Sequence, residues 1–515
     1  MTVTLSGRID STNAGTVEQA LQAQIAGQKE IVLDAQNLEY ISSAGLRGIL
    51  RIRKDHPELR IINVNSDVYE ILDMTGFTEM MPVEKAYRVV SVEGAEEIGR
   101  SANGTIYRID KDNVVKVYNN PEALEDIQHE REVAKLALIL GIPTAISYDV
   151  VKVGDSYGSV FELLNARSFA KILAREPEKL DWCVDEFVKM LKLIHSTVVP
   201  AGKLPDMKKT ALKWAAFMRV YLPEEAGDKL LSLVEAIPHD DHMLYGDYHT
   251  KNLGLQNDEV LLIDMDTLSV GHPIFELASM YNSFVGYSES DHEIIRKFQG
   301  FDWEIGMSFW RKSLAAYLGT NCPTKLKEVE NKSRVLGYTR MIRRSIRRKG
   351  LETEKGRAEI DLWKRELLEL LEYTDTLLFD KNELEIEAAS ENLAEVVTFL
   401  EERLETADCS PKARMQIQVA VEEIFVNIAS YAYQPETGKA TVRVEVSDNP
   451  VGVTITFVDH GVPYDPLAKA DPDVTASAEG RPIGGLGIFM TKKLMDDVSY
   501  EYREGRNILT LKKNL

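Results

Sequence analysis

Cysteine is scarce in this chain of 515 residues, and the three that occur, Cys183, Cys322 and Cys409, lie far apart. Three distant cysteines match neither a disulfide framework nor the ligand spacing of a zinc site. The nine histidines show no metal-ligand spacing either. We therefore expect isolated thiols and a reducing, cytoplasmic environment.

Positive charge is also in deficit, because 61 Lys and Arg residues stand against 82 Asp and Glu residues, for a net charge of -21. Such an acidic chain is not expected to bind nucleic-acid phosphates directly. No run of about 18 apolar residues occurs, so we expect no transmembrane helix and no membrane partner. The first residues, MTVTLSGRID, lack the basic and apolar stretches of a signal segment.

The residue pattern changes twice along the chain, which predicts a multidomain protein of α/β and α+β class. Residues 1–92 alternate short extended runs with helical patterns, as a small α/β domain does. Residues 96–376 begin with extended runs and continue mainly as helices. Residues 382–515 place helices before a sheet, which predicts an α/β sandwich.

Polar residues with the chemistry of a nucleotide site recur in the last segment. The helical pattern PKARMQIQVAVEEIFVN places Glu423 and Asn427 four residues apart on one face. A carboxylate and an amide so placed can orient a hydroxyl and hold Mg²⁺. The strand in TITFVDHG ends at Asp459, which can accept a hydrogen bond from the adenine amine, and Gly461 follows in a turn.

A glycine cluster precedes the next helix, whose first N–H groups can face phosphates. Together, EEIFVN, DHGVPYDP and GGLGIFM resemble the ATP-binding boxes of the histidine-kinase-like ATPase superfamily, most nearly its anti-sigma-factor serine kinase branch. The resemblance implies Glu423 as general base, Asn427 as Mg²⁺ ligand and Asp459 as adenine reader. It also implies a serine on a protein partner as acceptor, a homodimer, and a phosphate loop made of Gly484, Gly485 and Gly487.

The middle segment holds a second set of phosphotransfer residues. In LYGDYHTKN, Asp247 and Asn252 lie five residues apart, and Asp264 follows a short apolar strand. One carboxylate is needed to take the proton of an acceptor hydroxyl, while an amide and a second carboxylate hold Mg²⁺. Upstream, Lys116 on a strand can contact phosphates, and Glu132 on the next helix can position that lysine.

GDYHTKN and GHPIFELA resemble the aminoglycoside phosphotransferase and choline-kinase-like branch of the bilobal protein kinase fold. The resemblance implies Asp247 as base, Asn252 and Asp264 on the metal, and Lys116 on the ATP phosphates. Tyr245 stands where this branch usually has His, and Glu276 where it usually has Asp. The base and metal positions are intact, which favours an active enzyme whose hydroxyl acceptor the sequence does not identify.

A basic stripe lies near the end of this segment, in YTRMIRRSIRRKG. One interpretation is a surface that docks an acidic neighbouring domain, and the other, which we favour, is a solvated helix face. The stripe consists of Arg340, Arg343, Arg344, Arg347 and Arg348.

Two adjacent serines mark a strand-to-helix corner in the first segment, YISSAGLRGI. LSGRIDSTNAGTVEQAL, this corner and VYEILDMTGFTEMM together resemble the STAS domain of anti-anti-sigma factors. The resemblance places Ser43 at the phosphoserine position and Ser42 where the family has Asp. A serine here can also simply cap the helix. A helix N-terminus tolerates a phosphate, so modification would change the surface and leave the fold intact.

These features predict a cytoplasmic partner-switching protein that transfers the ATP γ-phosphate to Ser43, in cis or on another copy. The expected partners are a STAS domain, its own or another copy's, and a sigma factor or other regulatory protein. Two alternatives remain open. The chain could be a small-molecule kinase regulated by its end domains, or a binding switch that responds to ATP without turnover.

Overall fold

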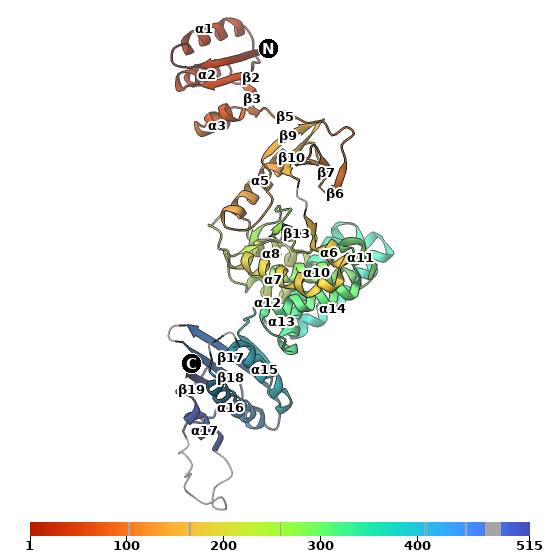
Figure 1. Cartoon of the computed structure of the whole chain (residues 1–515), viewed down its shortest axis with the longest axis vertical. Helices are drawn as coiled ribbons and strands as arrows, with labels where there is room; N and C mark the ends of the chain where they lie inside the picture. Colours follow the sequence, from red (N-terminus) through yellow and green to blue (C-terminus); the bar gives the residue numbers. More distant parts are fainter. Residues whose placement is uncertain are drawn as a thin grey trace, which may run out of the picture. The chain divides into compact units, whose positions relative to one another are not determined.

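The computed structural model describes residues 1–100, 103–163, 166–257, 259–405, 407, 409–448, 451–468 and 486–515. The chain separates into two compact units, Met1–Lys135 with Ala145–Leu164 and Leu136–Thr144 with Asn165–Leu515. Figure 1 follows the chain from the N-terminus in red to the C-terminus in blue. Within the described ranges, we find no helix with the length and apolar character that a membrane crossing requires.

The first domain is a small parallel sheet with helices, as the alternating pattern predicts. Its strands are ordered β1 (Thr2–Ile9), β2 (Val32–Ile41), β3 (Arg60–Val64), β4 (Val83–Lys85). All three pairings are parallel, so helical crossovers are required between the strands. The crossovers contain α1 (Ala14–Ile25), α2 (Ser43–Asp55), α3 (Ser66–Met74) and α4 (Phe77–Met80). Apolar residues of strands and helices, such as Leu33, Ile49 and Val68, form one buried core.

The corner between β2 and α2 gives the two adjacent serines different roles. Ser42 is the N-cap of α2, and its Oγ accepts a hydrogen bond from the Gly45 N–H at 3.4 Å. The Ser42 N–H donates to the Ile9 carbonyl at 2.8 Å, which ties the corner to β1. Ser43 is the first helical residue, and its side chain is exposed. The helix start therefore depends on Ser42 and leaves Ser43 accessible.

A second, six-stranded sheet follows and has the order β5-β9-β10-β8-β7-β6. Its edge strand β5 (Arg88–Val89) pairs with β9 directly after the first sheet ends at Lys85. The helix α5 (Leu124–Ile139) comes after β8 along the chain. The other strands are β6 (Glu97–Arg100), β7 (Gly104–Arg108), β8 (Asn113–Tyr118), β9 (Asp149–Val153) and β10 (Ser156–Glu162).

The middle of the chain is mainly helical and packs around α10 (Ile274–Phe284) (Figure 1). Ten of the eleven residues of α10 are buried, as expected of a central helix that other elements surround on all sides. The helices α12 (Trp303–Leu318) and α13 (Pro323–Arg347) pack on α10. The other helices of this part are α6 (Phe169–Arg175), α7 (Leu180–Ser196), α8 (Met207–Met218), α9 (Glu224–Glu235), α11 (Glu293–Gln299) and α14 (Glu354–Tyr373). Its short strands are β11 (Arg167–Ser168), β12 (Met243–Leu244), β13 (Leu253–Gln256), β14 (Glu259–Leu262) and β15 (Ser269–Val270).

The last domain is the predicted α/β sandwich. Its antiparallel sheet has the order β16 (Glu383–Glu387), β17 (Lys439–Asp448), β18 (Val451–Asp459), β20 (Arg506–Asn514), β19 (Asp497–Arg503). The helices are α15 (Leu393–Leu404), α16 (Pro411–Asn427) and α17 (Leu486–Leu494). Ile417, Val421 and Ile424 of α16 are buried against apolar side chains of the sheet. Ser410 caps α16, because its Oγ accepts the Ala413 N–H at 3.2 Å.

The turn between α12 and α13 packs on the sandwich, within one compact unit. The Glu402 carboxylate of α15 accepts the Asn321 N–H at 2.7 Å and the Thr320 hydroxyl. Cys322 is fully buried among the apolar residues of the sandwich core. All three cysteines are free thiols, which confirms the prediction of isolated cysteines.

Replacing Ser42 with Ala should loosen the first turn of α2, because the N-cap acceptor is lost. We expect the local opening free energy to fall by about 1 kcal/mol. Ser43→Ala is the matched control and should change it by less than about 0.5 kcal/mol, because that side chain is exposed. Hydrogen exchange of the α2 amides in the full chain measures the opening free energy in both variants. Equal decreases in the two variants would contradict the separate roles of the serines.

Candidate active sites

The C-terminal site is built on one face of α16. Glu423 and Asn427 both lie on this helix, four residues apart and half-buried. A Cβ built on Gly487 would lie 1.9 Å from the Glu423 Oε2, so the first turn of α17 lies directly against the carboxylate. A larger residue at this position would require the Glu423 side chain to move. The residue proposed as base therefore lies beside the start of α17.

Asp459 is held in place at the end of β18 and is 6% exposed. Its Oδ1 accepts hydrogen bonds from the Gly461 N–H at 2.9 Å and the Asn507 Nδ2 at 2.8 Å. Its Oδ2 has no donor among the described residues. One fixed oxygen and one available acceptor fit the recognition of an exocyclic amine such as that of adenine.

Asn507 is a site residue that the sequence argument missed. It lies directly opposite Asp459 in the β18–β20 pairing and is 6% exposed. Its Oδ1 accepts from the Tyr500 hydroxyl at 2.7 Å and from the Tyr464 N–H at 3.2 Å. Asn507 thus orients the Asp459 carboxylate, and the Tyr500 hydroxyl on β19 in turn orients the Asn507 amide. The segment EGRNILTLKK contains it, but no local pattern shows which strand residue faces Asp459.

The phosphate loop predicted for this site is described only in part. Gly487 begins the described first turn of α17, whereas Gly484 and Gly485 lie outside the described residues. No group of three or more His, Cys, Asp or Glu side chains within the described ranges could hold a metal ion. The amide oxygen of Asn427 is the kind of single protein oxygen ligand that Mg²⁺ takes when substrate phosphates and water complete its shell.

The predicted base of the middle domain, Asp247, lies in a loop after β12 and is partly exposed. Its Oδ2 lies 3.3 Å from the His249 Nε2. Burial alone would raise the pKa of Asp247, but the hydrogen bond from His249 and the charges of Arg340 and Arg344 outweigh it and lower that pKa. The carboxylate is therefore ionised at neutral pH and able to accept a proton.

The predicted metal ligands flank this loop. Asn252 is 8% exposed, and its Nδ2 donates to the Asp247 carbonyl at 3.1 Å, which leaves the amide oxygen for a ligand. Asp264 has a backbone φ of +67°, a left-handed conformation that is rare outside glycine and frequent at functional sites. The Tyr245 hydroxyl donates to the Asp264 carbonyl at 2.7 Å and to the Ile263 carbonyl. Tyr245, one of the two departures from the family pattern, thus ties the two loops together.

The second departure, Glu276, holds the backbone just before Asp247. Its carboxylate is 1% exposed and accepts the Tyr245 N–H at 2.5 Å and the Gly246 N–H at 2.9 Å. Gly246 has a φ of +88°, and a Cβ there would lie 2.4 Å from the Thr267 carbonyl oxygen. Burial raises the pKa of Glu276 to about 7, although the two N–H donors and the charge of Arg340 act in the opposite direction.

The structure corrects the predicted partner of Lys116. The Lys116 Nζ lies 3.1 and 3.2 Å from the two carboxylate oxygens of Glu130, and the Tyr118 hydroxyl donates to Glu130 at 2.5 Å. Glu132 is exposed, so its assignment was wrong. Two residues turn an α-helix by about 200°, which directs Glu132 away from the strand that carries Lys116. The choice of the wrong glutamate reflects the helix phase, which the short sequence HERE does not define.

Comparisons with known proteins match all three domains. A STAS domain model matches residues 1–90, a phosphotransferase enzyme family model residues 95–311, and a histidine kinase-like ATPase domain model residues 386–513. BtrV of Bordetella bronchiseptica, named as an anti-sigma factor antagonist, is 38% identical over 84 residues, 15% of this chain and 72% of that protein. The serine-protein kinase RsbW of Listeria monocytogenes is 32% identical over 111 residues, 21% of this chain and 69% of its own.

Among solved structures, an ADP-bound aminoglycoside phosphotransferase, APH(2'')-Ib, aligns with 14% identity and a TM-score of 0.36, over 59% of this chain and 98% of that one.

The domains and their matches to family models and relatives define a partner-switching signalling protein with ATP-dependent phosphotransferase activity. The chain belongs to the families of STAS anti-sigma factor antagonists and of RsbW-like serine kinases, joined here through a phosphotransferase-family domain.

Glu130→Gln should weaken ATP binding by the middle domain about tenfold, because the carboxylate charge beside the nearly buried Lys116 would be removed. Glu132→Gln is the matched control and should have no effect. Titration of ATP into full chains that also carry Asp459→Ala, to weaken binding at the C-terminal site, measures the middle site. Equal affinities for the two variants would contradict the assignment of Glu130.

Glu276 should make the middle domain less stable as the pH rises from about 4.5 to about 7, because its raised pKa means that the folded state binds the proton more tightly than the unfolded chain. In Glu276→Gln this part of the pH dependence should disappear. The five tryptophans all lie between residues 182 and 363, so their fluorescence during urea unfolding reports on this domain. If the unfolding free energy of Glu276→Gln changed with pH as it does in the unmodified chain, Glu276 would be ruled out as the source of this pH dependence.

Proposed function

We propose that the C-terminal ATPase domain transfers the γ-phosphate of ATP to Ser43 of a STAS domain, and that this modification controls the binding of a regulatory protein. One observation carries the proposal. Ser42 takes the capping role and leaves Ser43 exposed at the helix N-terminus, in a chain that also contains an RsbW-like kinase domain.

The residues of the C-terminal site suit this transfer. In the proposed step, the Glu423 carboxylate takes the proton of the Ser43 hydroxyl. A bond forms between the Ser43 Oγ and the γ-phosphorus, while the bond from this phosphorus to the β–γ bridging oxygen breaks and ADP leaves. Asp459 would bind the adenine amine. Asn427 would hold Mg²⁺, which neutralises charge on the phosphates when bound.

Phosphorylation of Ser43 would act through charge. The phosphate adds about -1.5 to -2 charges to an exposed surface and lies near the positive end of the α2 dipole, so the fold is retained. A partner that docks on this corner, such as a sigma factor or another regulatory protein, would meet an anionic surface after modification. Binding would then depend on the phosphorylation state.

The acceptor can be the chain's own STAS domain or that of a second copy. Tethering raises the effective concentration of an attached acceptor up to the millimolar range when the linkage spans the two sites. A homodimer would offer the same advantage in trans.

We place this reaction in the cytoplasm, with Mg²⁺ as metal. The middle domain would be a second phosphotransferase. That domain would use Asp247 as base, Asn252 and Asp264 on the metal, and Lys116 on the phosphates.

Incubation of the full chain with ATP labelled in the γ-phosphate should place label on Ser43. Ser43→Ala and Glu423→Ala should each abolish this label, whereas Ser42→Ala and Asp247→Ala should retain it. Mixing Ser43→Ala with Glu423→Ala protein distinguishes the two routes, because label on the second variant requires transfer between chains.

Other outcomes would favour the alternatives. Label on Ser43 that is lost with Asp247→Ala and kept with Glu423→Ala would assign the reaction to the middle domain. ATP binding without turnover in the unmodified chain would indicate a binding switch. Phosphate transfer only to an added small molecule would indicate a small-molecule kinase.

A further inference from the structure

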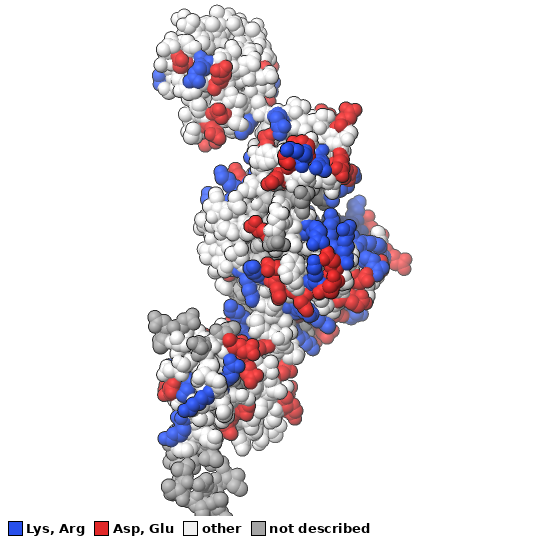
Figure 2. All heavy atoms as spheres, in the orientation of Figure 1, with Lys and Arg blue, Asp and Glu red and all other residues white. Residues whose placement is uncertain are grey.

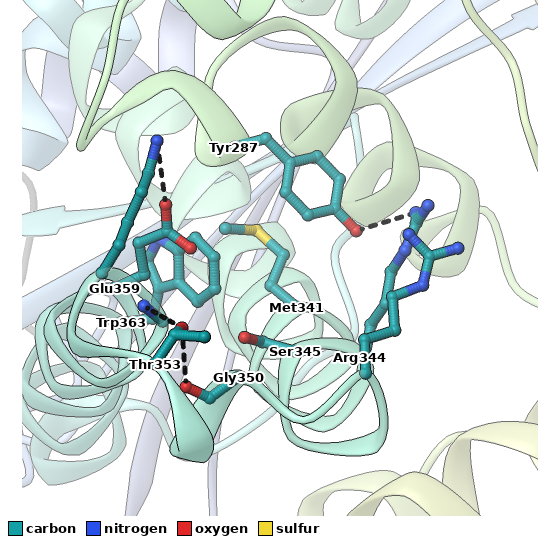
Figure 3. A pocket seen from close by; sticks show the side chains of 11 residues that line it. Tyr287, Met341, Arg344, Ser345, Gly350, Thr353, Glu359 and Trp363 are labelled. Atoms are coloured by element: carbon teal, nitrogen blue, oxygen red, sulfur yellow. Dashed lines mark hydrogen bonds and ion pairs between the residues drawn. The ribbon is translucent and has the colours of Figure 1, made fainter.

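A cavity outside the sites described above lies on the helical part of the chain. It has a volume of about 290 Å³ and lies between the end of α13, the short turn Gly350–Glu352 and α14. Tyr287 and Arg344 form one wall and Glu359 and Trp363 the other, with Met341 and Ser345 below them, as Figure 3 shows.

The pocket is positively charged. Three cations line it, Arg344, Arg348 and Lys355, against a single carboxylate, Glu359. The Lys355 Nζ lies 3.9 Å from that carboxylate and 3.2 Å from the Asp291 carboxylate, so the positive charge of the pocket rests on Arg344 and Arg348. Both are exposed, with Arg344 in the last turn of α13 and Arg348 at its C-cap. Figure 2 shows Lys and Arg side chains gathered over the part of the helical lobe where α11 and α14 lie.

Aromatic groups complete the lining. The Arg344 Nη1 donates to the Tyr287 hydroxyl at 3.3 Å, and its guanidinium lies 5.5 Å from the centroid of that ring. Trp363 is 3% exposed, so its indole ring closes the wall and its N–H is buried. Cations beside an aromatic ring suit a small ligand that is anionic at one end.

The same helix connects this pocket to the catalytic loop. The Arg340 Nη1 donates to the Gly246 carbonyl, next to Asp247, at 3.4 Å and to the Ser279 hydroxyl at 2.8 Å. Arg344 follows one turn later, about 6 Å along the helix axis. The charges of both arginines act on the Asp247 carboxylate. Consecutive turns of α13 therefore carry an arginine of the pocket and an arginine that contacts the backbone beside the proposed base.

We infer that this pocket binds the acceptor of the middle phosphotransferase domain, and that the acceptor is a small hydroxyl compound bearing a phosphate or carboxylate group. The anionic group lies between Arg344 and Arg348. The acceptor hydroxyl gives its proton to Asp247 and forms a bond to the γ-phosphorus of ATP, while the bond to the β–γ bridging oxygen breaks and ADP leaves. The volume of about 290 Å³ suits one small metabolite rather than a protein segment.

Calorimetric titration tests the ligand class, with glucose 6-phosphate as the anionic probe and glucose as its neutral counterpart. The full chain should bind the phosphorylated compound and not glucose. Arg344→Ala and Arg348→Ala should each weaken binding at least about tenfold, as expected for the loss of a charged hydrogen bond. Arg347→Ala is the matched control, because this exposed arginine lies on the same helix and outside the pocket lining.

A transfer assay with labelled ATP tests the role of the site. Anionic hydroxyl compounds, with glucose 6-phosphate and glycerol 3-phosphate as probes, should be phosphorylated and their neutral counterparts should not, and transfer should require Asp247. Equal binding of glucose and glucose 6-phosphate, or binding unaffected by Arg344→Ala and Arg348→Ala, would overturn the inference. Asp247-dependent label found on the protein rather than on the added compound would also overturn it, in favour of an acidic protein acceptor.

Discussion

A buried carboxylate organises the middle of this molecule. Glu276 has almost no contact with solvent, and such a group is stable only when its oxygens receive hydrogen bonds. The N–H groups of Tyr245 and Gly246 supply them, so the backbone just before Asp247 is fixed on the central helix α10. Tyr245 then ties this backbone to the segment of Asp264. The proposed base and one proposed metal ligand thus derive their positions from one desolvated charge.

The sequence was sufficient for the architecture because the relevant signals are local. Strand and helix periods, together with the family motifs, identified the three domains and their classes. Functional motifs placed Glu423, Asn427 and Asp247 on the elements where the structure has them. Such assignments depend only on the spacing of residues along one helix or loop.

The missed details depend on groups that are distant in sequence. Glu130 and Glu132 lie on the same helix, and only the packing of α5 on its sheet determines which one meets Lys116. Asn507 meets Asp459 through strand register, which no single strand reveals.

The basic stripe was judged to be a solvated face, but its members differ. Arg340 and Arg343 are half-buried, while Arg344, Arg347 and Arg348 are exposed. Helical spacing alone does not separate these environments.

The helix α13 has a mechanical consequence for this chain. Its N-cap residue, Cys322, is buried in the core of the ATPase sandwich, and its other end carries Arg344. The 25 residues from Pro323 to Arg347 form a helix of about 37 Å without an internal proline, and its one glycine, Gly337, is held by a hydrogen bond from the Asn282 Nδ2 to its carbonyl at 3.1 Å. A helix with one end fixed in a core moves as a unit. If the sandwich rearranges and α15 shifts, either the turn before α13 changes its conformation or α13 moves with α15. In the second case the arginines beside the Asp247 loop move as well.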